Sequence, residues 1–402
     1  MRKICILAFA TSITWNGITF AQDHVSWDLS NQSNNQPTQP ENKVEGPHSV
    51  SIELESPYKL MRGGGQADFW TPDRYRNAKP IPLPKATETD AISEYMEFSD
   101  HAEQVSEPGR PPEIKVKRSK AILFEPIIDQ DSDHEVQMYN ALEYDTYASG
   151  TAGAPFSSSR VAPAPTVQNS YPFRTTGKLF FSDSAGNSYH CTASVLRLRL
   201  IITAGHCVLD PVKKQWYTNF KFIPAYHNGS APYGQWAATW IITTSAWANN
   251  STGKVPNQGD YALLEMQDNS LGQKIGTVTG YLGYRTYGLN NNHVSMFGYP
   301  VSFDAGNIMH RVDSNSFKST TYNTVEFGSD MTQGSSGGKF VENFGELSSG
   351  QYVSPMNAVV GVLSYGIESQ KIVGASILDS QFLNSSKTGI LDVACAHKSG
   401  NC

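Results

Sequence analysis

From Gly177 onward the chain consists of short apolar or alternating runs, separated by clusters of glycine, asparagine, aspartate and serine. Such runs lie at residues 178–181, 294–297 and 359–363. Short strands with regular turn residues between them are typical of an antiparallel barrel or sandwich. The pattern therefore predicts an all-β fold for the second part of the chain.

The stretch from Gln22 to about Ser159 has a different pattern. It is rich in proline, serine, asparagine, glutamine and acidic residues, and few of its segments could bury a core. Two short apolar islands are candidate strands, an alternating one at 50–54 and a continuous one at 121–124. We interpret residues 22–160 as a mostly irregular pro-segment. The alternative is a flexible linker or surface tether.

The first residues carry the pattern of a secretion signal. Arg2 and Lys3 precede a largely apolar stretch at 4–10, and residues 19–21 resemble a cleavage site that ends in a small residue. The apolar stretch is too short for a membrane-spanning helix. We therefore expect a signal peptide at 1–21 and a secreted protein, extracellular or periplasmic. The alternative is a cytosolic N-terminal strand.

The cysteine count agrees with an oxidising compartment. One of the five cysteines lies in the expected signal peptide, which leaves an even set of four: Cys191, Cys207, Cys395 and Cys402. An even set in a secreted chain suits disulfides, although the sequence leaves their pairing open. A free thiol pair near the C-terminus is the alternative for the last two.

Length and charge limit the classes of function. Of the 402 residues only the second part has the pattern of a packed core, so we expect one catalytic domain at 161–402. The net charge of −6 provides no basic surface for nucleic acid or for an anionic membrane. The sequence has no metal-type His/Cys spacing and no glycine-rich phosphate loop, so neither a metal nor a cofactor is implied. Loops could still bind calcium.

The candidate chemistry centres on Ser336, which is surrounded by glycines at 334–338. A serine hydroxyl is a weak nucleophile until a neighbouring base takes its proton. His206 follows an apolar run that ends in small residues, and Asp260 stands before a second apolar run. The order His, Asp, Ser is one of the known orders of a catalytic triad. Taken singly, the three are also explained as a flexible loop, a strand-end histidine and a turn aspartate.

Together these motifs resemble the chymotrypsin superfamily of secreted serine proteases, within it the bacterial-type branch of glutamyl endopeptidases and trypsin-like relatives. The matching residues are 203–207, 260–264, 298–300, 330–338 and 364–366. The resemblance implies two six-stranded antiparallel β-barrels with the active site in the cleft between them. His206 and Asp260 would come from the first barrel and Ser336 from the second.

The resemblance also implies roles for these residues. His206 would act as general base, Asp260 would orient its ring, and Ser336 would be the nucleophile. The backbone amides of Gly334 and Ser336 would form the oxyanion hole. In the family, cysteines at the places of Cys191 and Cys207 form a disulfide beside the catalytic histidine.

Asp330 stands where trypsin-like members carry the carboxylate at the base of the primary specificity pocket, which predicts cleavage after Arg or Lys. Ser364, Tyr365 and Gly366 resemble the pocket wall that pairs with substrate, and Gly374 is expected to leave the pocket open. The alternative for Asp330 is a turn aspartate. Glutamyl-specific relatives use a histidine where this chain has Leu363 and Ser364. This difference argues against specificity for glutamate, which is kept as the alternative.

Several positions depart from the family pattern. Ser335 replaces the aspartate that receives a new N-terminus in vertebrate-type members, and Thr332 replaces a cysteine that braces the pocket. Lys339 stands where proline is common. His190 is expected at the cleft rim or on the surface. The candidate processing points are the basic cluster at 115–118 and the bond Arg160–Val161.

The sequence therefore predicts a secreted serine endopeptidase that acts on protein or peptide substrates, as a monomer and without nucleic-acid or membrane partners. The alternative from another class is a catalytically silent, protease-like binding or adhesion protein. Loss of a triad member is the usual mark of such proteins, and all three candidates are present in this chain.

Overall fold

The computed structural model describes residues 43–46, 48–54, 69–86, 104–127, 148–149, 154–161, 166–320, 322–345 and 356–402. The expected signal peptide at 1–21 lies outside these residues. No described helix is long and apolar enough to cross a membrane.

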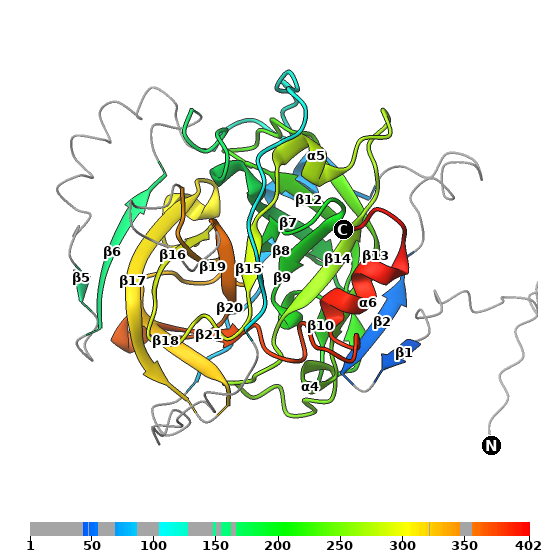
Figure 1. Ribbon diagram of the computed structural model, residues 1–402. Coiled ribbons are helices and arrows are strands. Elements are labelled where there is room, and N and C mark those ends of the chain that lie inside the picture. The colour runs from blue at the N-terminus through cyan, green and yellow to red at the C-terminus, as the bar shows by residue number, and fades with distance from the viewer. Residues whose placement is uncertain are drawn as a thin grey trace, which may run out of the picture. The chain divides into compact units, whose positions relative to one another are not determined.

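The first β-barrel closes through six antiparallel strands, drawn in green at the right of Figure 1. In order around the barrel they are β7 (Thr176–Ser182), β8 (Ser188–Val195), β9 (Leu200–Thr203), β14 (Ala262–Met266), β13 (Trp236–Thr244) and β12 (Thr218–Pro224), which pairs again with β7. A separate pair of short strands, β10 (Leu209–Asp210) and β11 (Gln215–Trp216), follows the histidine turn.

The second barrel closes in the same way, in yellow and orange at the left of Figure 1. Its strands, in order around the barrel, are β16 (His293–Gly298), β19 (Lys339–Glu342), β20 (Ala358–Ile367), β21 (Ile372–Ile377), β18 (Thr324–Gly328) and β17 (His310–Ser319), which pairs again with β16. The predicted all-β fold of two six-stranded barrels is confirmed, and the apolar runs at 178–181, 294–297 and 359–363 lie in β7, β16 and β20.

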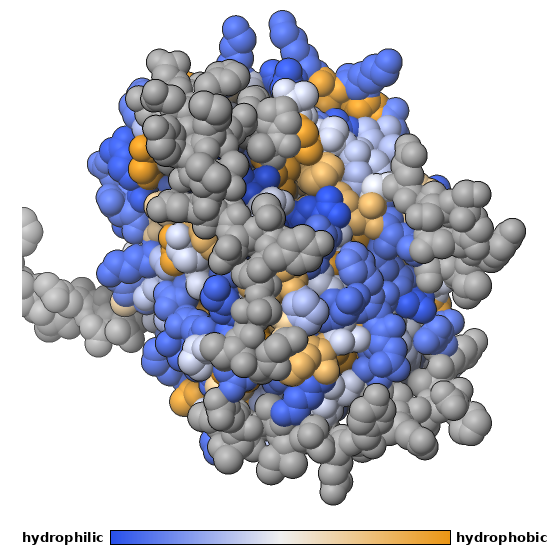
Figure 2. Space-filling view, turned by 90° about the vertical axis from the view of Figure 1, so that its left-hand side faces the viewer, coloured by the Kyte–Doolittle hydropathy of each residue, from blue (hydrophilic) through white to orange (hydrophobic). Residues whose placement is uncertain are grey.

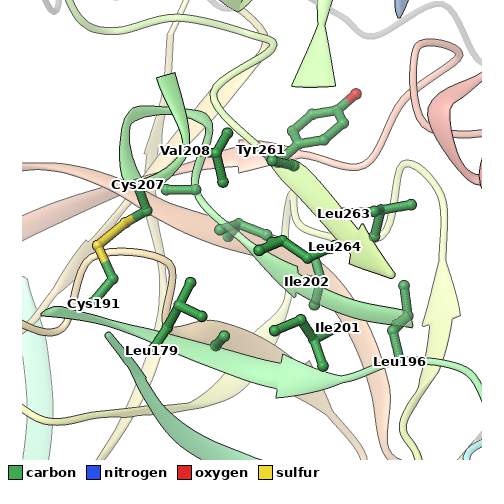
Figure 3. Close-up of a cluster of buried hydrophobic side chains, with 14 of the residues drawn as sticks. Leu179, Cys191, Leu196, Ile201, Ile202, Cys207, Val208, Tyr261, Leu263 and Leu264 are labelled. Atoms are coloured by element: carbon green, nitrogen blue, oxygen red, sulfur yellow. A yellow bond between two sulfur atoms is a disulfide. The ribbon is translucent and has the colours of Figure 1, made fainter. Parts of the chain in front are cut away.

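Strand formation follows from burial on the barrel interiors. Ile201 and Ile202 of β9 face a core that they share with Leu263 and Leu264 of β14, beside the disulfide of Cys191 with Cys207 (Figure 3). β-branched and large aliphatic side chains suit such a half-enclosed pleated surface. The apolar residues of the second barrel form a core cluster of their own.

Segments before residue 161 contribute strands to both sheets. These strands are β1 (Lys43–Gly46), β2 (Ser49–Glu53), β3 (Lys79–Pro80), β4 (Ser106–Glu107), β5 (Ala148–Ser149) and β6 (Pro155–Arg160). β3 lies parallel to β8, and β4 pairs with β15 (Gly283–Arg285), which lies parallel to β20. Strands from the described parts of the expected pro-segment therefore pair with strands of the barrels. Residues on both sides of the expected domain boundary at 161 belong to the same sheets.

The longest of these additions occupy equivalent places in the two barrels. In the first, β12 leaves β13 after Ala237, and β2 pairs with β13 from Trp240 to Thr244. In the second, β18 pairs with β17 only from Ser316 onward, and β6 pairs with β17 before that point. In each barrel the added strand gives hydrogen-bond partners to backbone N–H and C=O groups of β13 or β17. The neighbouring barrel strand, β12 or β18, does not reach these groups.

The two apolar islands of the N-terminal region have different outcomes. The island at 50–54 forms most of β2, so a strand is confirmed there. The island at 121–124 contributes only an isolated bridge between Ile122 and Ser230. Leu123 and Phe124 nevertheless enter a core cluster, so these two residues are buried by packing without a ladder, while Ile122 is exposed. Pro126, which has no N–H to donate, lies two residues after the island.

Helices are few among the described residues. They are α2 (Pro72–Arg76), α4 (Ser245–Ala248), α5 (Ile275–Thr279) and α6 (Ile390–His397), with 3₁₀ turns at Phe173–Thr175, Gly205–Cys207, Asp304–Gly306 and Glu368–Gln370. α6 packs on the first barrel, where the ring of His397 stacks on Trp240 with 4.2 Å between ring centroids. A second disulfide joins Cys402 to Cys395, which lies within this helix.

The side of the second barrel that carries β6 and β17 faces the reader in Figure 2, where hydrophilic and hydrophobic residues are interspersed among the residues that are coloured. Apolar residues scattered on a surface are ordinary and mark no binding site by themselves.

We expect the Cys191–Cys207 disulfide to stabilise the fold more than Cys395–Cys402 does. It spans 16 residues, against 7 for the C-terminal bridge, and in the loop-entropy view a longer closed loop restricts the unfolded chain more. The double change Cys191→Ala with Cys207→Ala should lower the free energy of unfolding by roughly 3 kcal/mol, and the C-terminal pair by roughly 2 kcal/mol. Urea unfolding of both double variants measures the two losses. An equal or larger loss at the C-terminal pair would contradict the expectation.

Candidate active site

His206 lies in the 3₁₀ turn that follows β9, and its position is held from several sides. The disulfide of the next residue, Cys207, ties the turn to Cys191 on β8. Gly205 packs so closely that an added Cβ would come within 2.7 Å of the Trp247 ring and 3.1 Å of Asp260 Oδ1. Only glycine allows this approach, which brings the histidine turn against the carboxylate.

Asp260 is fully buried and accepts hydrogen bonds from two residues in the two barrels. Its Oδ1 accepts from the His206 backbone N–H at 2.8 Å, and its Oδ2 lies 2.8 Å from His206 Nδ1. The hydroxyl of Ser364 on β20 donates to the same Oδ2 at 2.6 Å. A buried carboxylate is stable only with such partners. Because Asp260 engages Nδ1, the tautomer with its proton there leaves Nε2 as a proton acceptor.

Ser336 lies between the two barrels. Its carbonyl accepts from Thr192 N–H of β8 at 2.9 Å, and the next residue, Gly337, donates from its N–H to Leu363 of β20 at 3.0 Å. Ser336 Oγ and His206 Nε2 are both buried, and neither has a hydrogen-bond partner among the described residues. The structure thus brings His206 and Asp260 into contact and places Ser336 at the junction, without a formed bond between serine and histidine. Such bonds are often long before substrate binds.

The backbone around Gly334 has the properties of an anion-binding turn. Gly334 has φ +92°, and an added Cβ would lie 2.6 Å from Tyr299 O and 2.9 Å from His190 Cε1. Both the dihedral angle and the space require glycine. Thr192 Oγ1 donates to Gly334 O at 2.9 Å and so orients this peptide. Within the described chain the N–H groups of Gly334 and Ser336 donate to no other group, which leaves two amides free for an oxyanion.

Two buried basic side chains lie on the far side of this turn. His190 was expected at the rim or surface, but it is buried, and its ring fills the space next to Gly334. Burial, together with the positive charge of Lys178, lowers the pKa of His190 well below its usual value. Lys178 donates from Nζ to Gly306 O at 2.9 Å and lies 4.9 Å from the Tyr226 ring centroid. Burial lowers the pKa of Lys178 to about 7.

Asp330 lies between β18 and Ser336, beside the strand β6. Its Oδ1 is buried without a hydrogen-bond partner in the described chain, and so is Ser158 Oγ on β6. Burial raises the pKa of Asp330 above its usual value, while the Ser158 hydroxyl lowers it in part. A buried carboxylate oxygen without a donor is a site at which a cationic side chain would be stabilised.

The expected pocket wall is present, but two of its members are arranged differently from the expectation. Ser364 supports Asp260, a role that the sequence did not indicate. The ring of Tyr365 lies directly on Gly374, where an added Cβ would be 2.0 Å from Tyr365 Cζ, and its hydroxyl donates to Glu326 at 3.1 Å. The room that Gly374 leaves is therefore filled by this tyrosine, whereas the sequence analysis expected an open pocket there.

Sequence reasoning found the triad candidates, the glycine turn and Asp330, and it missed the buried lysines. Lys178 begins the run at 178–181 of β7, which was interpreted only as a strand signal. Lys339 is fully buried on β19, where Nζ donates to Thr175 Oγ1 at 3.1 Å, and burial lowers the pKa of this lysine well below its usual value. In both places the lysine follows a glycine and begins an apolar run of a strand, which is the signal that could have found them.

The described residues contain no group of three or more His, Cys, Asp and Glu side chains that could hold a metal ion.

This chain is similar to known bacterial proteases. A model of the trypsin family matches residues 164–377. A glutamyl endopeptidase of Bacillus licheniformis is 29% identical over 143 residues, which are 35% of this chain and 40% of that protein. An extracellular metalloprotease of Bacillus subtilis is 25% identical over 118 residues, 29% of this chain and 34% of that protein. The matches thus span less than half of either relative.

Solved structures of bacterial proteases are also similar. The protease Anisep from Arthrobacter nicotinovorans is 29% identical, with a TM-score of 0.43 over 51% of this chain and 90% of that one. A Glu endopeptidase solved in complex with MPD is 18% identical, with a TM-score of 0.45 over 59% of this chain and 94% of that one.

Lys178 makes the stability of the fold depend on pH. With its pKa lowered to about 7 in the folded chain, Lys178 is neutral there above pH 7, while in the unfolded chain it keeps its proton to about pH 10. The unfolded state therefore binds more protons in this window, and stability should rise with pH across it. Lys178→Met should flatten that rise. The pKa of Lys339 is also lowered by burial, so in Lys178→Met the stability should still rise with pH, but less steeply.

Thermal or urea unfolding of wild type and Lys178→Met at pH 7 and pH 10 measures this effect. Lys213→Met is the matched control, because the Lys213 side chain is 72% exposed and its removal should leave the slope unchanged. Equal slopes in wild type and Lys178→Met would show that the lysine is charged in the folded protein.

Proposed function

Because the chain belongs to the trypsin family, we propose that it is a serine endopeptidase that hydrolyses peptide bonds through an acyl-enzyme on Ser336. One observation carries the proposal. The buried carboxylate of Asp260 lies 2.8 Å from His206 Nδ1, which leaves Nε2 on the side of the ring that is free to take a proton. A histidine oriented in this way is the base that a serine nucleophile requires.

The proposed reaction has two halves. In the first, His206 Nε2 takes the proton of Ser336 Oγ as the oxygen attacks the substrate carbonyl carbon. The tetrahedral intermediate then collapses, the C–N bond breaks, and His206 returns the proton to the leaving amine. In the second half, water gives its proton to His206 and attacks the ester, and the acid product leaves as Ser336 regains its proton. Asp260 stabilises the imidazolium in both halves.

The negative charge that develops on the carbonyl oxygen would be held by the amides of Gly334 and Ser336. Support comes from their free N–H groups and from the φ of +92° that only glycine adopts easily at position 334. Loss of one such donor typically costs about 3 kcal/mol of transition-state stabilisation. Thr192, which donates to Gly334 O, would keep the turn in this orientation.

We infer that the enzyme cleaves after Arg or Lys, with Asp330 as the group that pairs with the substrate cation. The unpartnered, buried Oδ1 of Asp330 supports this choice. A specificity for glutamate is the alternative, since one relative is named a glutamyl endopeptidase. A glutamate-binding pocket needs a basic group. His310, the histidine near Asp330, is instead held by Asp304, whose Oδ2 lies 2.8 Å from its Nε2.

The chain is proposed to consist of three functional segments. We propose that residues 1–21 direct secretion, that 22–160 act as a pro-segment and that 161–402 carry the protease domain. The two disulfides of the described chain support an oxidising compartment. A catalytically silent binding protein is the alternative from another class, and the ordered pair of His206 and Asp260 favours the enzyme over it.

The nucleophile is tested by active-site labelling. A fluorophosphonate probe should label the processed protein, and Ser336→Ala should abolish the labelling because the attacking oxygen is lost. Ser335→Ala is the matched control, since the Ser335 hydroxyl is turned away to Thr332 O and its loss should leave labelling intact. Labelling that is lost in Ser335→Ala and kept in Ser336→Ala would move the nucleophile by one residue. No labelling of the processed wild type would favour the silent binding protein.

Specificity is tested by a peptide-library profile of wild type and Asp330→Ser. The wild type should prefer Arg or Lys before the cut bond. In Asp330→Ser, kcat/KM for such substrates should fall by about 10²–10³-fold, because loss of one partner of a buried charge pair costs roughly 3–4 kcal/mol. Asp313→Ser is the control, since Asp313 pairs with Arg311 at 2.8 Å away from the proposed pocket. A wild-type profile that peaks at Glu, or at large apolar residues, would refute the assignment.

A further inference from the structure

The proposed nucleophile and base are closed off in the intact chain. Ser336 is 0% exposed and His206 is 6% exposed. Their reacting atoms, Oγ and Nε2, are buried yet have no hydrogen-bond partner in the described chain. A protease site must receive a polypeptide in an extended form, so burial of both atoms calls for a segment that covers them.

Residues 79–86, which we call the cleft segment, contact one wall of the site. Lys79 and Pro80 of β3 lie parallel to Tyr189 and His190 on β8. The N–H of Ile81 then donates to the His190 carbonyl at 3.1 Å. β8 is the strand that carries Cys191 and Thr192, so the cleft segment lies along the strand that holds both the histidine turn and the serine loop.

The same segment contacts the opposite wall. Gly366 N–H on β20 donates to Pro84 O at 3.0 Å, and Lys85 forms a parallel bridge with Gly366. Leu83 is 2% exposed and packs on Gly366, where an added Cβ would lie 2.7 Å from Leu83 Cδ2. Gly366 is part of the proposed substrate-binding wall, so Leu83 occupies space that a substrate side chain would use.

Ser336 lies between these two contacts. It is bonded to β8 through Thr192 N–H, and its neighbour Gly337 is bonded to β20 through Leu363 O. The cleft segment meets β8 at Ile81 and β20 at Pro84. Three residues in extended form span about 10 Å. The chain from Ile81 to Pro84 therefore crosses from one barrel to the other over the serine loop.

The composition of the cleft segment suits an inhibitor. Prolines at 80, 82 and 84 alternate with Ile81, Leu83 and Lys85. Such a sequence is preformed as an extended polyproline-type chain and loses little entropy on binding. The bonds that follow Ile81 and Leu83 both lead into a proline, whose ring fixes φ and carries no N–H. The segment thus fills the cleft with few bonds suited to cleavage.

We propose that residues 79–86 are a built-in peptide ligand of the catalytic cleft, anchored by Leu83, and that they keep the uncut chain inactive. The inference rests on the proposed function and adds a mechanism by which the proposed activity is regulated. It also selects between the two candidate processing points. Lys115, Lys117 and Arg118 are exposed, and a cut there separates the cleft segment from both barrels. The bond Arg160–Val161 is instead enclosed, with Arg160 paired to Asp304 and Val161 buried.

Fluorophosphonate labelling of the uncut full chain tests the closure. Leu83→Asp should label at least about tenfold faster than wild type, because a tethered ligand acts at an effective concentration of roughly millimolar and its release removes that competition. Ile122→Asp is the matched control, since Ile122 also precedes the barrels but is 61% exposed, and it should label like wild type. An unfolded variant would not label, so faster labelling reports an open, folded site. Labelling of wild type and Leu83→Asp at the same measurable rate would overturn the inference.

A binding measurement separates this inference from the proposed chemistry. The probe is a fluorescent synthetic peptide of residues 79–86, and the receptor is the full chain with Ser336→Ala and Leu83→Asp, in which the tethered copy is displaced. Fluorescence anisotropy should show saturable binding, at least about tenfold tighter than binding to Ser336→Ala alone, and a Leu83→Asp peptide should not bind. Such binding without labelling of any form would reject the proposed chemistry and keep the cleft ligand. Labelling of the folded protein without peptide binding would reject the cleft ligand and keep the chemistry.

Discussion

The enclosed carboxylate of Asp260 is the interaction on which the rest of the site depends. A charge with no exposed surface is tolerated only when donors surround it, because its desolvation costs several kcal/mol. Two of the three donors come from His206 on the first barrel and one from Ser364 on the second. The same requirement that stabilises the charge therefore orients the imidazole and joins the two barrels where Ser336 lies. Gly205 serves the same contact, since a side chain there would push the turn away from the carboxylate.

The two barrels are not sufficient to describe the fold of the intact chain. β2 pairs with the part of β13 that β12 leaves open. β6 pairs in the same way with the part of β17 that precedes its pairing with β18. Between these two additions, the cleft segment connects β8 to Gly366 of β20. The region before residue 161 thus acts as a set of short strands that satisfy open backbone groups of both barrels. A segment of low hydrophobicity can be ordered in this way because the barrels supply the partners that its own sequence lacks.

The sequence alone predicted much of the frame, and the misses share a cause. Short apolar runs predicted the strands, and the resemblance carried by His206, Asp260 and Ser336 implied two barrels with these residues in the cleft between them. The direction of a side chain within a strand was harder, because polar residues on a barrel strand are ordinarily turned to solvent. His190 packs against Gly334 of the second barrel instead. The position of the Tyr365 ring was also not predicted. Tyr365 is the cross-strand neighbour of Gly374, and its ring fills the space that the glycine leaves.

The sequence by itself determined the local chemistry of this protein: strand-forming runs, a histidine turn next to a cysteine, and a glycine-rich turn around Ser336 that no other residue type could form. These are properties of a few adjacent residues. The tertiary structure alone decided which groups became neighbours across long separations. It placed Ser364 on Asp260, Lys178 on the Gly306 carbonyl, and Leu83 on Gly366. Those contacts depend on closure of both barrels, because closure removes the water that would otherwise satisfy and screen each of these groups.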